Sequence, residues 1–214
     1  MPFEFRRRRR RRSPGAAAGG GATARPASLP FEALTEEWRL VGRMETAGQL
    51  SDVLNKREAI PIVDVQWAPI DGSASFSPAP DLESVDPYDL ILVVVTKASP
   101  PRRSETETRA HQVHRVSYDV GLEVPPFRVV GTVLLLPGAE PSRLLERATE
   151  MFVPVVEAVA YLGDRAVSDP QTETILVNRF YLRGVEQVDK RTGERVQRLP
   201  GAPLGGVSWQ DRSR

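Results

Sequence analysis

The pattern of apolar and polar residues predicts a chain made mostly of β-strands. In the clearest strand, residues 116–124, apolar side chains at every second position alternate with polar residues or glycine. Comparable patterns predict strands at 37–45, 60–67, 127–136, 152–161 and 175–188. Residues 90–96 form a continuous apolar run, which is typical of a central strand buried on both faces.

Two segments have apolar residues at helical spacing instead. Leu50, Val53 and Leu54 form one stripe, which predicts a short helix between the strands at 37–45 and 60–67. Pro141 favours the first turn of a second helix. The apolar side of that helix would be formed by Leu144, Leu145, Ala148 and Met151.

Two phrases occur twice in the same order. Residues 38–42 (WRLVG) resemble residues 127–131 (FRVVG), and residues 60–65 (IPIVDV) resemble residues 153–158 (VPVVEA). We interpret this repetition as an internal duplication. The repeat units would span about 36–98 and about 126–188, with a linking strand at about 113–124.

The predicted fold class is mainly β (α+β), in a single duplicated domain over residues 31–199. The units contain strand, helix, strand and strand, which gives about eight strands and two short helices in total. So many strands usually curl or close, and we therefore expect a bent sheet or barrel. A two-layer arrangement with both helices on one face of the sheet is the alternative.

Charge is distributed unevenly along the chain, although the net charge is only +1. Residues 1–30 contain eight arginines and one acid, whereas residues 31–189 contain 15 basic and 25 acidic side chains. Residues 190–214 are basic again, with six basic and two acidic side chains. Because like charges repel, we expect residues 1–30 to be a disordered arm and residues 200–214 a flexible basic tail.

The arm contains an unbroken run of seven arginines, for which three interpretations stay open. The run could tether the protein to nucleic acid or another polyanion by releasing counterions, or to an acidic membrane surface. It could instead reflect codon bias or a misplaced start, because the chain has 26 arginines among its 29 basic side chains. A third possibility is that the arm lies against its own acidic body. The residues of the run are Arg6, Arg7, Arg8, Arg9, Arg10, Arg11 and Arg12.

Four charged residues fall at matching places in the two repeats: Arg39 with Arg128, and Asp64 with Glu157. Paired acids at a seam between the units could act as general acid and base if burial separated their pKa values. We favour the simpler interpretation that each acid forms a structural ion pair with the arginine of its own unit. We predict no catalytic residue at any position.

The sequence offers few other candidates for chemistry. His111 and His114 precede a strand, where their odd spacing would place them on opposite faces, so we predict no metal site and no cofactor. Arg179, Tyr181 and Arg183 alternate along the predicted strand 175–188. Such a face can stack on and hold single-stranded nucleic acid, although an ordinary solvated face is the more frequent explanation.

These observations favour a non-catalytic binding or assembly module. Its basic arm would tether it to an anionic partner such as nucleic acid, while its acidic body binds a protein or a small ligand. The alternative is a ligand-sensing or enzymatic domain with its site at the seam between the units. The sequence has no cysteine and no apolar run of the roughly 20 residues that a transmembrane helix needs, so we expect a cytoplasmic protein without a transmembrane segment.

Overall fold

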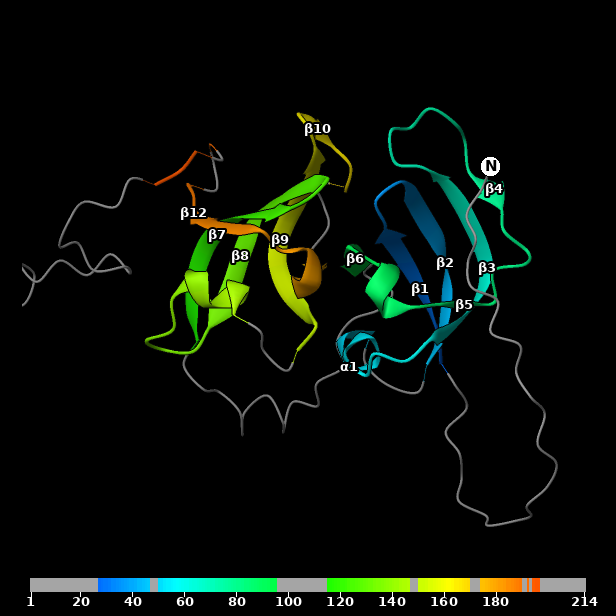
Figure 1. Ribbon diagram of the computed structural model, residues 1–214, viewed down its shortest axis with the longest axis horizontal. Coiled ribbons are helices and arrows are strands. Elements are labelled where there is room, and N and C mark those ends of the chain that lie inside the picture. Colours follow the sequence, from blue (N-terminus) through cyan, green and yellow to red (C-terminus); the bar gives the residue numbers. More distant parts are fainter. Residues whose placement is uncertain are drawn as a thin grey trace, which may run out of the picture.

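The strands of the protein form one antiparallel sheet. The computed structural model describes residues 27–46, 50–95, 115–146, 150–169, 174–189, 192 and 194–196. Twelve strands of these described residues lie in the sheet, and Figure 1 shows them in two groups on either side of β6. The strands are β1 (Ala27–Leu34), β2 (Trp38–Thr46), β3 (Ile60–Pro69), β4 (Ser77–Pro78), β5 (Ser84–Val85), β6 (Leu92–Val95), β7 (Val116–Val124), β8 (Phe127–Leu135), β9 (Phe152–Leu162), β10 (Arg165–Ala166), β11 (Thr174–Asn178) and β12 (Gly184–Gln187).

The described residues contain one α-helix, α1 (Leu50–Asn55), and three short 3-10 helices. These are η1 (Pro87–Asp89), η2 (Pro141–Leu145) and η3 (Arg179–Tyr181). No helix in this part of the chain has both the length and the apolar character needed to cross a membrane.

The order of the strands divides the sheet into two units. It runs β12-β7-β8-β9-β11-β6-β1-β2-β3-β4, with β10 paired to β9 and β5 paired to β3. We call the elements from β1 to β6 the first unit and those from β7 to β12 the second unit. The units meet where β11 pairs with β6, which we call the junction.

Each unit has its own hydrophobic core, and the central strands contribute to both. In β6, Leu92 packs in the core of the second unit, whereas its neighbour Val93 packs in the core of the first. Successive residues of a strand point to opposite faces, so the two cores lie on opposite faces of β6. The prediction that residues 90–96 include a central strand buried on both faces is therefore confirmed.

Both units contain a β-bulge opposite a glycine. The register between β2 and β3 shifts between Val41 and Arg43, and that between β8 and β9 shifts between Val130 and Thr132. The skipped residues are Gly42 and Gly131. A Cβ on Gly131 would lie only 2.9 Å from the Cα of Ala158, so the two backbones approach too closely for a side chain.

The mainly β fold class is confirmed, but several details differ from the prediction. The sheet is not closed into a barrel, because β12 and β4 remain at opposite ends of the strand order in the described part of the chain. The second predicted helix is only the 3-10 helix Pro141–Leu145, and Met151 directly precedes β9 instead of lying on a helical face. The predicted strand 175–188 is interrupted by η3, because the Asn178 side chain caps a turn there.

The N-terminal boundary of the body also differs from the prediction. β1 pairs with β2 from Ala27 onward, so residues 27–30 belong to the sheet and not to the predicted arm. Pro30 weakens the sequence signal of this strand, because proline is uncommon inside strands. Residues 1–26 and 197–214 lie outside the described residues.

Candidate functional site at the junction of the two units

The junction is a backbone ladder between β11 and β6. Leu176 pairs with Val93, and Val177 pairs with Leu92. One step further, the backbone N–H of Asn178 donates to the carbonyl oxygen of Ile91 at 2.9 Å. The two units are thereby joined by the same kind of hydrogen bonds that join strands within each unit.

Two asparagine side chains add polar contacts across the junction. Asn178 is fully buried, and its Nδ2 donates to the carbonyl oxygens of Leu90 at 2.7 Å and of Pro87 at 3.3 Å. At the end of α1, Asn55 Oδ1 accepts hydrogen bonds from the backbone N–H groups of Met151 at 2.7 Å and Phe152 at 2.9 Å. Amide side chains suit this place because they donate and accept without carrying a charge into the interior.

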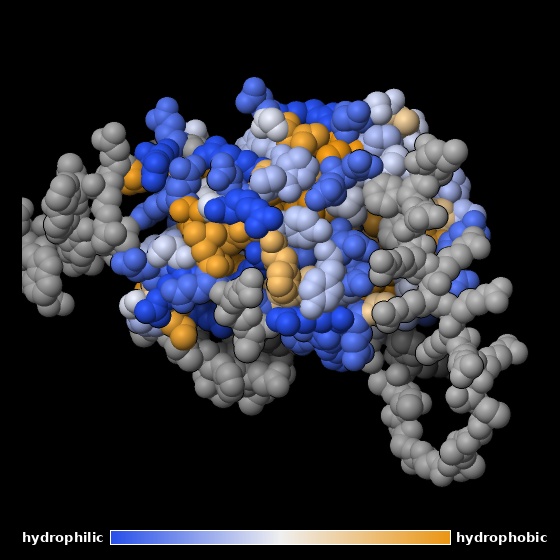
Figure 2. All heavy atoms as spheres, in the orientation of Figure 1, coloured by the Kyte–Doolittle hydropathy of each residue, from blue (hydrophilic) through white to orange (hydrophobic). Residues whose placement is uncertain are grey.

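An exposed group of aromatic and arginine side chains covers the junction. The rings of Tyr88 in η1 and Phe180 in η3 lie 5.4 Å apart, although 41% and 50% of these residues remain exposed. Arg57 lies over the Phe180 ring at 5.9 Å, and the Tyr181 hydroxyl donates to the Tyr88 carbonyl oxygen at 3.1 Å. Figure 2 shows a mostly hydrophilic face with separate apolar patches, one of which lies over η3 near the middle of the view. We call Arg57, Tyr88, Arg179, Phe180 and Tyr181 the aromatic patch.

Partial burial shifts the pKa values of groups in and beside this patch. Desolvation raises the pKa of Tyr181, and the charges of Glu36 and Asp89 raise it further. Desolvation, followed by the charge of Asp86, raises the pKa of Asp89. The pKa of Arg179 is lowered by desolvation, against an opposing effect of Glu150. All three shifts favour the neutral form of the group. The surface by the junction carries the carboxylates that cause part of these shifts as well as arginines, and it is therefore not uniformly basic.

The four residues predicted at the seam lie away from the junction. Arg39 is on β2 and Asp64 on β3, whereas Arg128 is on β8 and Glu157 on β9. Arg39 Nη2 contacts Glu32 Oε1 at 2.8 Å, and Arg128 Nη2 contacts Glu186 Oε1 at 3.0 Å. Each arginine thus has an ion-pair partner within its own unit, but that partner is a glutamate, on the adjacent strand β1 for Arg39 and on β12, two strands away, for Arg128.

The matched acids share an unusual backbone conformation. Asp64 has a φ of 53° and Glu157 a φ of 48°, both in the left-handed region. They are the exposed residues of the two bulges opposite Gly42 and Gly131. Their positions are matched because both bulges need a residue that turns the strand, which the sequence alone did not reveal.

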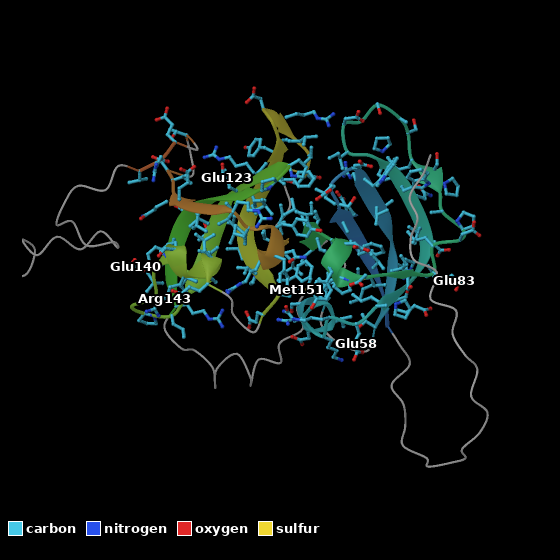
Figure 3. The ribbon with its side chains drawn as sticks, in the orientation of Figure 1. Glu58, Glu83, Glu123, Glu140, Arg143 and Met151 are labelled. Atoms are coloured by element: carbon cyan, nitrogen blue, oxygen red, sulfur yellow. The ribbon has the colours of Figure 1, made fainter. Side chains whose placement is uncertain are left out.

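Asp64 also lines a shallow groove of about 500 Å³ along the outer side of β3. The lining is mostly apolar and carries a second acid, Glu83, which Figure 3 labels at the right-hand side of the molecule. None of the other predicted seam residues lines this groove. Its full lining is Ile62, Val63, Asp64, Val65, Gln66, Pro78, Ala79, Pro80, Leu82 and Glu83.

The remaining sequence-based candidates have different outcomes. Arg6 to Arg12 and both histidines lie outside the described residues. Arg179 and Tyr181 are in a 3-10 helix and not on a strand face, so the predicted alternation with Arg183 is wrong. Within the described ranges, no group of three or more His, Cys, Asp or Glu could hold a metal ion.

The aromatic patch was not predicted from the sequence. A usable signal was present in the segments Asp86–Leu90 and Asn178–Leu182. Each begins with an Asx residue and ends with a leucine four positions later. In both, the Asx side chain accepts a hydrogen bond from the backbone N–H two residues ahead.

Comparisons with protein-family models, with curated proteins and with solved structures found no match for this chain.

Proposed function

We propose that this protein is a non-catalytic assembly module built from two copies of one five-stranded unit, with an arginine arm that tethers it to an anionic partner such as nucleic acid. The junction is the observation that carries the proposal. There β11 of the second unit pairs with β6 of the first, so the units themselves supply an assembly contact.

The strand order supports the proposed duplication. Five strands of the first unit have the order β6-β1-β2-β3-β5, and five of the second have the order β12-β7-β8-β9-β11; the two-residue strands β4 and β10 are additional pairs on β3 and β9. The short strand β5 pairs with the start of β3 through Ile60 and Val85, and β11 pairs with the start of β9 through Val153 and Val177. A 3-10 helix follows in both cases, and the chain then continues into β6 or β12.

The two cores support the duplication at the level of single residues. Offsets of 89, 93 and 92 positions in successive segments relate nine buried residues of the first core to nine of the second. Residues of common ancestry that keep the same buried face would produce this match. The pairs are Phe31 and Val120, Ala33 and Leu122, Leu40 and Val129, Met44 and Val133, Ile60 and Val153, Ile62 and Val155, Val65 and Ala158, Val85 and Val177, and Leu90 and Leu182.

The proposed tether depends on the charge of the arm. Seven adjacent guanidinium groups would displace counterions from a nucleic acid, and the resulting affinity would fall steeply with salt. The acidic body cannot supply this affinity, because residues 31–189 carry ten more acidic than basic side chains.

The tether is tested by titrating single- and double-stranded oligonucleotides over a salt series. The full chain is compared with a full-length variant in which Arg6 to Arg12 are replaced by serine, which leaves β1 unchanged. We expect the full chain to bind the oligonucleotides with an affinity that decreases by about tenfold or more between 50 and 200 mM salt. We expect no binding by the serine variant. Equal binding by both chains would contradict the arm's role, and no binding by either would contradict a nucleic-acid partner.

A ligand-sensing or enzymatic role is the second candidate, and the groove beside β3 favours it. The groove combines apolar walls with the carboxylates of Asp64 and Glu83, as small-ligand sites combine apolar surface with a few polar groups. A ligand screen read by thermal shift separates the two candidates, since hits lost in Asp64→Asn and Glu83→Gln would place a ligand in the groove.

A further inference from the structure

We propose that copies of this chain bind one another head to tail, with β12 of one copy pairing with β5 of the next in the way that β11 pairs with β6 inside the chain. This inference rests on the proposed duplication and names the partner of the assembly module as a second copy. A unit that presents two complementary edges uses one of each at the internal junction and leaves the other two for a neighbour.

The strand orders identify those two remaining edges. In the spatial order of the strands, and not in the order along the chain, β6 and β12 are the first strands of the two units, and β5 and β11 are the last. Inside the chain, the first strand of one unit pairs with the last strand of the other. The first strand β12 and the last strand β5 therefore remain as the equivalent pair, and the described part of the chain does not pair them with each other.

Hydrogen bonds within each unit determine which backbone groups face outward. The Ile62 N–H donates to the Glu83 carbonyl at 3.0 Å, so Glu83 and Val85 face β3, and Ser84 between them faces away. On the other edge, the Val188 N–H donates to the Asp119 carbonyl at 3.1 Å. By the same alternation Gly184 and Glu186 face β7, and Val185 faces away.

The internal junction gives the register of the proposed contact. Leu176 opposite Val93 corresponds to Ser84 opposite Val185 of the next copy. The bond from the Asn178 N–H to the Ile91 carbonyl corresponds to one from the Asp86 N–H to the Arg183 carbonyl. The ladder ends near Gln187, whose carbonyl already accepts from the Val196 N–H at 2.9 Å.

The two edges lie on different sides of the molecule, which suits a contact between copies. Figure 3 labels Glu83 near β5 at the right and Glu123, which pairs with Gly184 of β12, towards the left. A heterologous contact of this kind closes into a ring or continues as a filament.

Side chains make this contact weaker than the internal junction. β6 contributes Leu92, Val93, Val94 and Val95, whereas β12 contributes Gly184, Val185, Glu186 and Gln187. Fewer apolar groups are buried, and the backbone bonds carry more of the interaction. We therefore expect a reversible, concentration-dependent assembly instead of a permanent one.

The experiment uses two variants of the full chain, Ser84→Pro and Val185→Pro. Each removes one outward N–H from one edge, and edge strands tolerate proline where the N–H faces solvent. Masses are measured by light scattering over a concentration series up to about 1 mM, a range that covers weak and moderate affinities. Ser84→Ala and Val185→Ala are the matched controls, because they change the side chain and keep the N–H.

We expect the wild-type chain and both alanine variants to form species that are multiples of the 23.7 kDa monomer. Each proline variant alone should remain a monomer, since every copy lacks the same edge. An equimolar mixture of the two proline variants should form a dimer and nothing larger, because one intact β12 then meets one intact β5. Formation of that dimer also shows that both variants are folded.

Three results would overturn the proposal: a wild-type chain that stays monomeric over the whole series, proline variants that assemble as the wild type does, or folded proline variants whose mixture stays monomeric. The oligonucleotide titration does not depend on these masses. A failed tether and a failed assembly are therefore distinguished by separate measurements.

Discussion

Asp86 and Asn178, which the proposed duplication makes equivalent, show how one turn serves two environments. Both side chains cap a 3-10 helix by accepting a hydrogen bond at 3.0 Å, from the Tyr88 N–H in one unit and the Phe180 N–H in the other. Asp86 is exposed, whereas Asn178 is fully buried and uses its amide nitrogen to bind two carbonyl oxygens of the first unit. The side-chain oxygen thus supports the turn, and the amide nitrogen supports the junction.

Replacing that nitrogen should give the largest effect. Asn178→Asp keeps the capping oxygen but places a carboxylate against the carbonyls of Pro87 and Leu90, with no donor for either. We expect the free energy of unfolding to fall by about 3 kcal/mol at pH 7, because a buried charge would face unsatisfied acceptors. Urea unfolding monitored by circular dichroism measures this loss.

Asp86→Asn is the matched control for this change, because it makes the opposite exchange at an exposed cap. It should alter the free energy of unfolding of the monomer by less than about 0.5 kcal/mol, since asparagine and aspartate are similar N-caps. Equal effects at both positions would mean that the amide nitrogen of Asn178 has no special role at the junction.

The two bulges provide the next comparison. A Cβ on Gly131 would lie 2.7 Å from Val155 Cγ1 and 2.9 Å from the Cα of Ala158, whereas one on Gly42 would come no closer than 3.1 Å to any atom. Gly131→Ala should therefore lower the free energy of unfolding by about 2 kcal/mol, and Gly42→Ala by about 1 kcal/mol. Thermal unfolding of the two variants side by side gives the order, and a larger loss for Gly42→Ala would show that the bulge in the second unit relaxes more easily.

The sequence predicted the strands β7 and β8 well, because the alternation of their side chains depends on local contacts. Residues 116–124 and 127–135 form strands almost at the predicted limits, since each has one face in a core. The repeated aromatic-Arg-aliphatic-Val-Gly phrase ends at Gly42 and Gly131, the two glycines opposite the bulges. It could not show why glycine stands there, because the reason lies on the partner strand, at the bulges of Asp64 and Glu157.

The candidate site was predicted less well, for a similar reason. Matching positions suggested that Arg39, Asp64, Arg128 and Glu157 meet at a seam, but these residues lie on β2, β3, β8 and β9, away from the junction. The strands that do meet are β11 and β6, and the residues that cover them belong to turns. A turn capped by an Asx side chain has no periodic apolar signal, and the interruption of 175–188 by η3 was therefore missed.

The left-handed residues of the bulges give a smaller and opposite effect. Glycine adopts positive φ without strain, and aspartate tolerates it better than glutamate does. Glu157→Gly should therefore raise the free energy of unfolding by up to about 1 kcal/mol, and Asp64→Gly by less. The difference in midpoint between the two variants in urea unfolding tests this order. A loss of stability in Glu157→Gly would mean that the contacts of the glutamate side chain outweigh the backbone strain.

The smallest expected effect concerns Asp89 beside the aromatic patch, whose counterpart in the proposed duplication is the uncharged Tyr181. Burial and the nearby charge of Asp86 raise the pKa of Asp89, so the folded state disfavours its charged form. Above that raised pKa, the carboxylate is ionised in both states and lowers stability. Below the ordinary value of 3.8, it is protonated in both states and the penalty disappears.

Asp89→Asn should thus raise the free energy of unfolding at pH 7 by less than about 0.5 kcal/mol, because the group is largely solvated. The gain, measured as a small rise in melting temperature, should vanish as the pH falls through this window. A gain that is equal at pH 7 and below 3.8 would assign the effect to the amide itself and not to the removed charge.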